Sequence, residues 1–182
     1  DDGIPHRWLA VAKNAMVTLT AQYSSDRMVM EYVKDAYVPA AQRHALMCRD
    51  NYALARRLAA WKHDLASRFL TVQITEVLVE GMEGDVLLCG HPLQATVTLK
   101  PGTMPPDELL VQLVAGQSQG RDFVDVPSVV NLKQVRHMDD GRLVYAGSLT
   151  VVQSGQYAYG VRVMASTEGL GSPIETRLVL WA

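Results

Sequence analysis

The feature that most constrains the fold is a change of sequence pattern near residue 70. Before this point apolar residues recur at spacings of three and four, and glycine is nearly absent after Gly3. After it, β-branched residues alternate with polar ones, and glycine or proline interrupts the chain roughly every eight to twelve residues. The 182 residues are therefore predicted to form an α+β chain, with a helical segment at 1–70 and a β domain at 71–182.

Three helices are predicted in the first segment. The first should begin at Pro5, whose fixed φ suits an opening helical turn. The second has Ser24 or Ser25 as its N-cap and Asp26 in its first turn, where a negative charge is favourable. The third should run from about 40 to 69, and one face of it is apolar: Met47, Leu54, Leu58, Trp61, Leu65 and Phe69. Arginines and lysines occupy the rest of this helix, which indicates a solvated surface or ion pairs with another domain.

The second segment is predicted to contain short strands. The candidates are 72–79, 85–89, 93–99, 109–115, 129–135, 143–151, 157–164 and 176–180. Asp139-Asp140-Gly141 is typical of a hairpin turn. Short strands at this spacing favour an antiparallel, immunoglobulin-like β-sandwich, with a closed barrel as the alternative. Because the immunoglobulin Cys…Trp…Cys pattern is missing, this prediction depends on strand number and spacing alone.

Charge and composition exclude several classes of function. Lys and Arg total 17 against 19 Asp and Glu, a net charge of -2, which gives no electrostatic reason to expect a nucleic-acid or membrane partner. No apolar run approaches the roughly 18 residues of a membrane-spanning helix, and the start lacks the pattern of a signal peptide. The absence of an initial Met agrees with a fragment or a processed chain. Cys48 and Cys89 have no partners at zinc-binding spacing, so we expect reduced thiols, no metal site and a cytoplasmic location.

No catalytic group is predicted within the chain. The five histidines are scattered and none has the HExxH spacing of a zinc protease. A G-x-S-x-G nucleophile motif is also missing from the sequence. Glu76 with Glu80, or Asp122 with Asp125, could supply paired carboxylates, but we interpret them as surface charges.

The first forty residues carry a recognisable pattern. It consists of Gly3, Pro5, Trp8, Lys13, Met16, Tyr23, Ser25, Asp26, Arg27, Met28, Val29, Glu31, Tyr32, Tyr37, Pro39 and Ala40. This pattern resembles the C-terminal end of the catalytic region in α-glucan phosphorylases, the bacterial and archaeal branch of the glycogen phosphorylase family. The resemblance implies that the helical segment ends a Rossmann-like glycosyltransferase lobe, and that the chain is a C-terminal fragment.

The resemblance also implies what the parent enzyme does. Such a phosphorylase transfers glucose from a non-reducing α-1,4-glucan end to phosphate, using pyridoxal phosphate on a lysine in a segment like E-x-x-G-T-S-x-M-K. No such segment occurs in this chain, and Lys13 belongs to the helical pattern rather than to the cofactor site. We therefore expect a non-catalytic scaffold without cofactor, whose partner is the remainder of the parent catalytic domain.

Individual residues are assigned roles with their alternatives. The family motif residues Trp8, Asp26, Arg27, Glu31 and Tyr32 are predicted to be structural, although Arg27 could instead contact phosphate or sugar. In the sandwich, strand alternation places Tyr157 and Tyr159 on one face, where they could bind α-glucan.

The wider set of aromatics that could form this platform also includes Tyr145 and Trp181. Alternatively, the tyrosine face points into the sandwich or forms an interdomain or subunit contact. A carbohydrate-binding or protein-interaction module is accordingly the alternative function.

Overall fold

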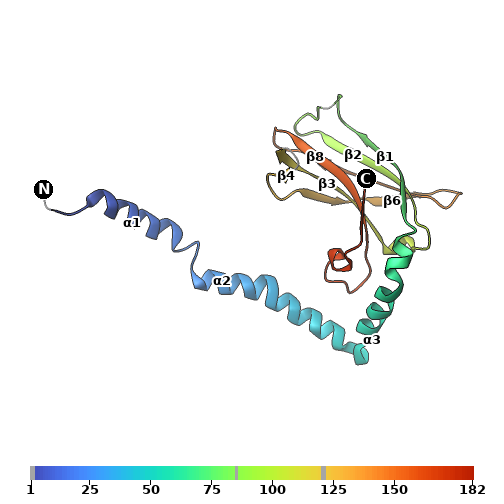
Figure 1. The fold of residues 1–182 in the computed structure, drawn as a ribbon, viewed down its shortest axis with the longest axis horizontal. Coiled ribbons are helices and arrows are strands. Elements are labelled where there is room, and N and C mark those ends of the chain that lie inside the picture. Colours follow the sequence, from blue (N-terminus) through green and yellow to red (C-terminus); the bar gives the residue numbers. More distant parts are fainter. Residues whose placement is uncertain (1–2, 85, 120–121) are drawn as a thin grey trace. The chain divides into compact units, whose positions relative to one another are not determined.

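A computed structural model describes residues 3–84, 86–119 and 122–182 (Figure 1). The chain divides into two compact units, Asp1–Ala55 and Arg56–Ala182. Helices come first and two antiparallel sheets follow, which confirms the α+β prediction. No helix in the described part of the chain is both long and apolar enough to cross a bilayer.

The first unit is helical. Its elements are α1 (His6–Leu19), α2 (Ser25–Tyr32), the π-helical turn η1 (Val33–Tyr37) and the beginning of α3 (Val38–Phe69). Ser24 is the N-cap of α2, because its hydroxyl accepts a hydrogen bond from the Arg27 N–H at 3.3 Å. Pro5 precedes α1 by one residue, and its carbonyl accepts the first helical hydrogen bond, from Leu9. Local capping signals therefore located both helix starts to within a residue.

Helix α3 is interrupted, contrary to the prediction of one continuous helix. Arg49 is extended, with ψ 152°, and the next three residues have φ of 50°, 53° and 62° at Asp50, Asn51 and Tyr52. The left-handed region costs an L-residue about 1–2 kcal/mol, but Asp and Asn adopt it most readily because their short polar side chains bond locally. The Asp50-Asn51 pair is the sequence signal for this break.

The second unit is built on two antiparallel sheets (Figure 1). The first has the order β1-β2-β7-β6, formed by Gln73–Glu80, Pro92–Lys100, Leu143–Thr150 and Lys133–His137. The second has the order β4-β3-β8-β9, formed by Asp122–Phe123, Leu109–Gln119, Tyr157–Ala165 and Val179–Trp181, and β5 (Ser128–Asn131) also pairs with β3. No described strand of one sheet pairs with the other, so the architecture is a two-layer sandwich rather than a closed barrel.

One core joins the two sheets and the end of α3. Val97 from the first sheet and Val163 from the second are both fully buried and belong to the same apolar cluster. Leu65 and Phe69 of α3 belong to this cluster too, and Trp61 packs against it. The predicted apolar face is thus confirmed for the last turns of α3. Because Leu65 and Phe69 are buried in the core of the sandwich, the end of α3 belongs to the second unit, which begins at Arg56.

Three strand predictions differ from the structure. Residues 86–89 form no strand beyond an isolated bridge between Glu83 and Val86, and residue 85 lies outside the described part. The predicted strand 129–135 is divided between β5 and β6, which belong to different sheets, and Leu132 between them is buried in the core. At 176–180, a 3₁₀ turn (η3, Pro173–Thr176) comes first and β9 begins only at Val179.

The Asp-Gly turn between β6 and β7 is confirmed. Gly141 has φ +82°, and its N–H donates to the Met138 carbonyl at 3.0 Å. The backbone N–H of Arg142, and then its guanidinium, donate to Asp140 at 3.1 and 2.6 Å. These bonds lower the pKa of the Asp140 carboxyl, because they favour its charged form.

Candidate functional site

The predicted motif residues of α2 pair with one another. Arg27 Nε lies 3.3 Å from Glu31 Oε1, one helical turn away, and both side chains are about half exposed. The rings of Tyr32 and Tyr37 meet edge to face, with centroids 6.4 Å apart. An exposed ion pair of this kind contributes at most about 1 kcal/mol. The structural role of Arg27, and its alternative of a phosphate or sugar contact, stay predictions.

The apolar side chains of the first unit are exposed. None of the described residues in α1, α2 or η1 is buried. Large apolar side chains with more than two-fifths of their surface exposed include Trp8, Val11, Met16, Val17, Tyr23, Met28, Val29, Met30, Tyr32 and Tyr37. Surface helices normally bury such residues, so the described residues of α1, α2 and η1 present an apolar surface.

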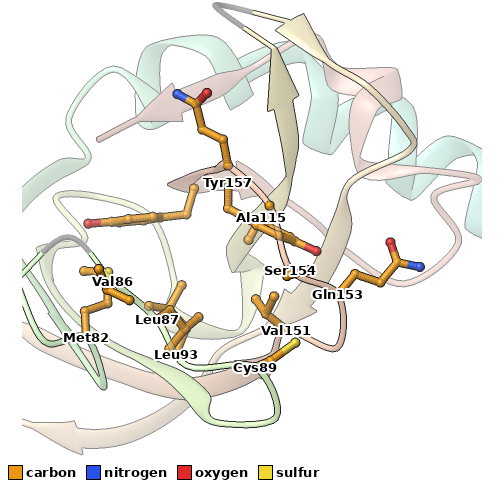
Figure 2. A pocket seen from close by; sticks show the side chains of 13 residues that line it. Met82, Val86, Leu87, Cys89, Leu93, Ala115, Val151, Gln153, Ser154 and Tyr157 are labelled. Carbon is orange, nitrogen blue, oxygen red and sulfur yellow. The ribbon is translucent and has the colours of Figure 1, made fainter.

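The two predicted sugar-binding tyrosines share one cavity in the second unit. Tyr157 and Tyr159 lie on the face of β8 that also carries the buried core residues Val161 and Val163. Toward the start of β8 this face lines a cavity of about 650 Å³. The other lining residues are Met82, Val86, Leu87, Cys89, Leu93, Ala115, Val151, Gln153, Ser154, Gly155 and Gln156. Figure 2 shows Leu87, Leu93 and Val151 grouped together, with Cys89 beside them.

Backbone hydrogen bonds hold the walls of this cavity. The Gly90 N–H donates to the Val151 carbonyl at 2.8 Å, which joins the β1–β2 loop to the loop before β8. On the other side the Ser118 N–H donates to the Gln156 carbonyl at 2.9 Å. Gly81 has φ +102°, and a Cβ there would lie 2.3 Å from the Pro92 carbonyl oxygen, so this loop requires glycine.

The four aromatic residues do not form a single platform. Tyr145 is buried, its hydroxyl lies 3.4 Å from the Pro106 carbonyl, and burial raises the pKa of its phenol. Trp181 pairs with Arg162 across β8 and β9, on the face of the sheet opposite Tyr157 and Tyr159. The guanidinium carbon of Arg162 lies 5.6 Å from the Trp181 ring centroid. Only the two tyrosines remain together.

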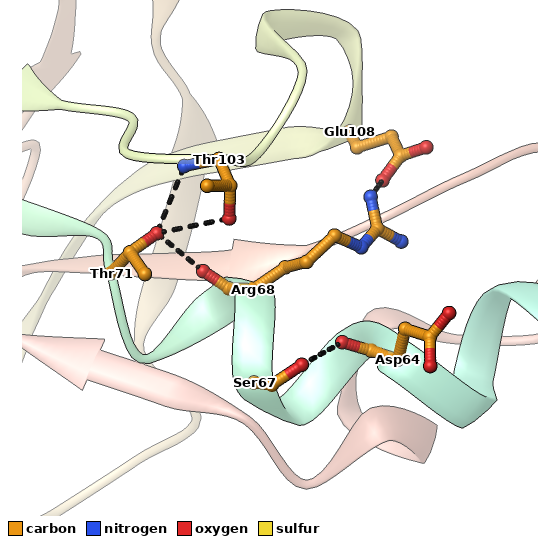
Figure 3. Close-up of polar contacts among 6 residues, drawn as sticks. All are labelled: Asp64, Ser67, Arg68, Thr71, Thr103 and Glu108. Carbon is orange, nitrogen blue, oxygen red and sulfur yellow. Dashed lines mark hydrogen bonds and ion pairs between the residues drawn. The ribbon is translucent and has the colours of Figure 1, made fainter.

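The basic side of α3 pairs with carboxylates of the sandwich. Arg68 Nη1 lies 2.9 Å from Glu108 Oε2, and both side chains are at most a quarter exposed (Figure 3). Two other cations of α3 form such pairs: Lys62 pairs with Glu175, and Arg57 pairs with Glu168. The sequence left open a solvated surface or ion pairs with another domain for this helix. It could not give the partners, because residues up to 113 positions apart meet.

Threonine hydroxyls tie the end of α3 to the β2–β3 turn. Thr71 Oγ1 donates to the Arg68 carbonyl at 2.7 Å and accepts from the Thr103 N–H at 2.9 Å (Figure 3). A Cβ at Gly102 would lie 2.0 Å from that oxygen, so the turn can approach the helix only with glycine there. Together with the ion pairs, this contact makes the end of α3 an integral part of the sandwich.

The described residues that line the tyrosine cavity do not fit a metal or cofactor site. The described residues include no cluster of three His, Cys, Asp or Glu side chains suited to a metal ion. No lysine is among the described residues that line the tyrosine cavity, and Lys62 is held by Glu175. These residues therefore do not fit a lysine-bound pyridoxal phosphate.

The second unit is a two-layer antiparallel β-sandwich domain, with the end of α3 packed into its core. Residues 70–182 match the family model described as "Glycogen phosphorylase C-terminal domain". The match covers well over half of the chain, so the chain belongs to this family.

Similarity to individual phosphorylases extends into the helices. A glycogen phosphorylase of Mycobacterium tuberculosis is 27% identical over 180 residues, covering 99% of this chain and 21% of that protein. One from Mycobacterium bovis gives the same values. A maltodextrin phosphorylase of Thermococcus litoralis is 22% identical over 178 residues, 96% of this chain and 20% of that protein. The chain thus spans about a fifth of the length of these relatives, and the predicted resemblance to α-glucan phosphorylases is confirmed.

Proposed function

We propose that the chain acts as the C-terminal part of an α-1,4-glucan phosphorylase. Such an enzyme transfers glucose from a non-reducing glucan end to phosphate with pyridoxal phosphate as cofactor. The observation that carries the proposal is the extent of the similarity: it runs through the helices and the sandwich of this chain, in enzymes about five times as long. Both units therefore belong to one larger catalytic assembly.

In this proposal the helical unit completes a Rossmann-like catalytic lobe, and the rest of that lobe is its partner. The exposed apolar side chains of α1 and α2, such as Trp8 and Met28, supply the contact surface. The Arg27–Glu31 and Tyr32–Tyr37 pairs maintain the shape of the α2 region before it docks. The chain then contributes packing and position, while the cofactor lysine belongs to the preceding region.

The sandwich serves as a scaffold attached to that lobe. The buried residues and ion pairs at the end of α3 attach this part of the helix to the sheets. Cys48 and Cys89 are free thiols, which suits the reducing cytoplasm where we place the enzyme.

The coding sequence upstream of Asp1 tests the proposal. We expect it to encode a glycine-rich segment with a cofactor lysine, and we expect the longer protein to release glucose 1-phosphate from maltoheptaose and phosphate. The 182-residue chain alone should not release glucose 1-phosphate from maltoheptaose. It should also not form a borohydride-reducible adduct with pyridoxal phosphate on one lysine. Phosphorolysis by the chain alone, or an upstream frame without such a segment, would contradict the proposal.

A further inference from the structure

We propose that the cavity lined by Tyr157 and Tyr159 binds a stretch of uncharged α-1,4-glucan, a ligand identity that rests on the proposed function. Its volume, about 650 Å³, falls within the roughly 300–1,000 Å³ typical of small-molecule sites. The cavity is therefore large enough for sugar units rather than for a single water or ion.

The charge of the lining selects the kind of ligand. Among the described residues that line the cavity there is no Asp, Glu, Lys, Arg or His. A phosphate or carboxylate entering it would lose hydration without meeting an opposite charge, which is costly. An uncharged ligand avoids this penalty, so the cavity suits glucan and excludes a sugar phosphate.

The distribution of polar and apolar groups matches a sugar ring. Leu87, Leu93 and Val151 supply an apolar wall, and the two tyrosine rings add aromatic faces. The polar lining residues are in the loop that leads to β8: Gln153, Ser154 and Gln156. Their side chains can form hydrogen bonds with hydroxyls at the edge of a sugar ring. A glucose unit presents C–H groups on its faces and hydroxyls around its edge, which is the same combination.

The cavity is formed before a ligand arrives. Gln117 Nε2 donates to the Ser154 carbonyl at 3.2 Å, and the bonds from Gly90 and Ser118 hold the other segments. Tyr157 is half-buried against the core, whereas Tyr159 is 46% exposed and can meet a ligand from solution. Little ordering is then required on binding, which favours affinity for a flexible glucan.

Cys89 provides a direct probe, because it lines the cavity and is exposed. In the full chain carrying Cys48→Ala, we would measure the alkylation rate of Cys89 by iodoacetamide with increasing maltoheptaose. We expect saturable protection by maltoheptaose, and no protection by glucose 1-phosphate at the same concentration. Equal protection by both, or by neither, would overturn the proposal.

Two variants separate binding from folding. Tyr159→Ala removes an exposed ring. It should raise the maltoheptaose concentration that gives half-maximal protection by about five- to tenfold and leave the circular dichroism spectrum unchanged. Trp181→Ala, which removes an exposed aromatic from the opposite face of the same sheet, is the matched control and should leave protection unchanged. Equal effects of the two variants would refute the site. Because the assay uses the isolated chain and no phosphorolysis, its failure leaves the upstream-sequence test of the proposed function intact.

Discussion

Replacing Gly102 by alanine should strongly destabilise the sandwich unit. Gly102 has φ +58°, and a Cβ there would lie 2.0 Å from Thr71 Oγ1 and 2.5 Å from Thr71 Cβ. The left-handed backbone costs alanine about 1–2 kcal/mol. Moving Thr71 away would also break its hydrogen bonds with the Arg68 carbonyl and the Thr103 N–H, at about 1 kcal/mol each. The expected loss in the free energy of unfolding is therefore about 3–4 kcal/mol.

Gly141→Ala is the matched control for this change. Gly141 also has positive φ, +82°, but nothing lies within 4 Å of an added Cβ. Gly141→Ala should therefore lower the free energy of unfolding only by the cost of left-handed backbone for alanine, about 1–2 kcal/mol. Urea unfolding followed by far-ultraviolet circular dichroism measures both losses. If Gly102→Ala were no worse than Gly141→Ala, the reasoning that the turn packs tightly on Thr71 would be refuted.

Three further predictions concern the core, pH and the helical unit. Leu65 is 3% exposed, and Leu65→Ala should lower the free energy of unfolding by about 2–5 kcal/mol. Leu70 is 81% exposed, and Leu70→Ala should change it by less than about 0.5 kcal/mol. Equal losses of the two variants in urea unfolding would contradict the packing of α3. Because burial raises the pKa of Tyr145 above its ordinary value of 10.0, stability should be full below pH 10 and fall above it as the unfolded state ionises. Thermal unfolding from pH 9 to 11 should show a shallower decline for Tyr145→Phe, and identical slopes would argue against this assignment. Limited trypsin digestion should cut residues 3–55 first and leave a resistant fragment that begins near Arg56; initial cleavage within the sheets would contradict the division into units.

Local signals in the sequence predicted much of the fold. The cap at Ser24 depends on residues within one helical turn, and the buried face through Leu65 and Phe69 depends on a repeat along one helix. The same is true of strands such as β2 and β8, whose alternation is visible in sequence. Such short-range patterns do not require knowledge of the partner element.

Features that depend on distant partners could not be predicted. The partners of the α3 cations, such as Glu108 for Arg68, follow from how the helix lies against the sheets. The prediction that Tyr157 and Tyr159 share one face is confirmed, because both lie two residues apart on β8. The face on which Trp181 lies depends instead on its pairing with Arg162 of the neighbouring strand. Sequence alternation alone therefore could not tell that Trp181 lies on the other face.

Hydrogen–deuterium exchange of α1 and α2 tests the central claim most directly. The measurement compares the 182-residue chain with the longer protein that the proposed function requires. We predict fast exchange of amides at 6–32 in the chain alone, where no described residue of these helices is buried, and strong protection in the longer protein. Equally fast exchange in both proteins would show that the helices do not complete a catalytic lobe, and would contradict the account.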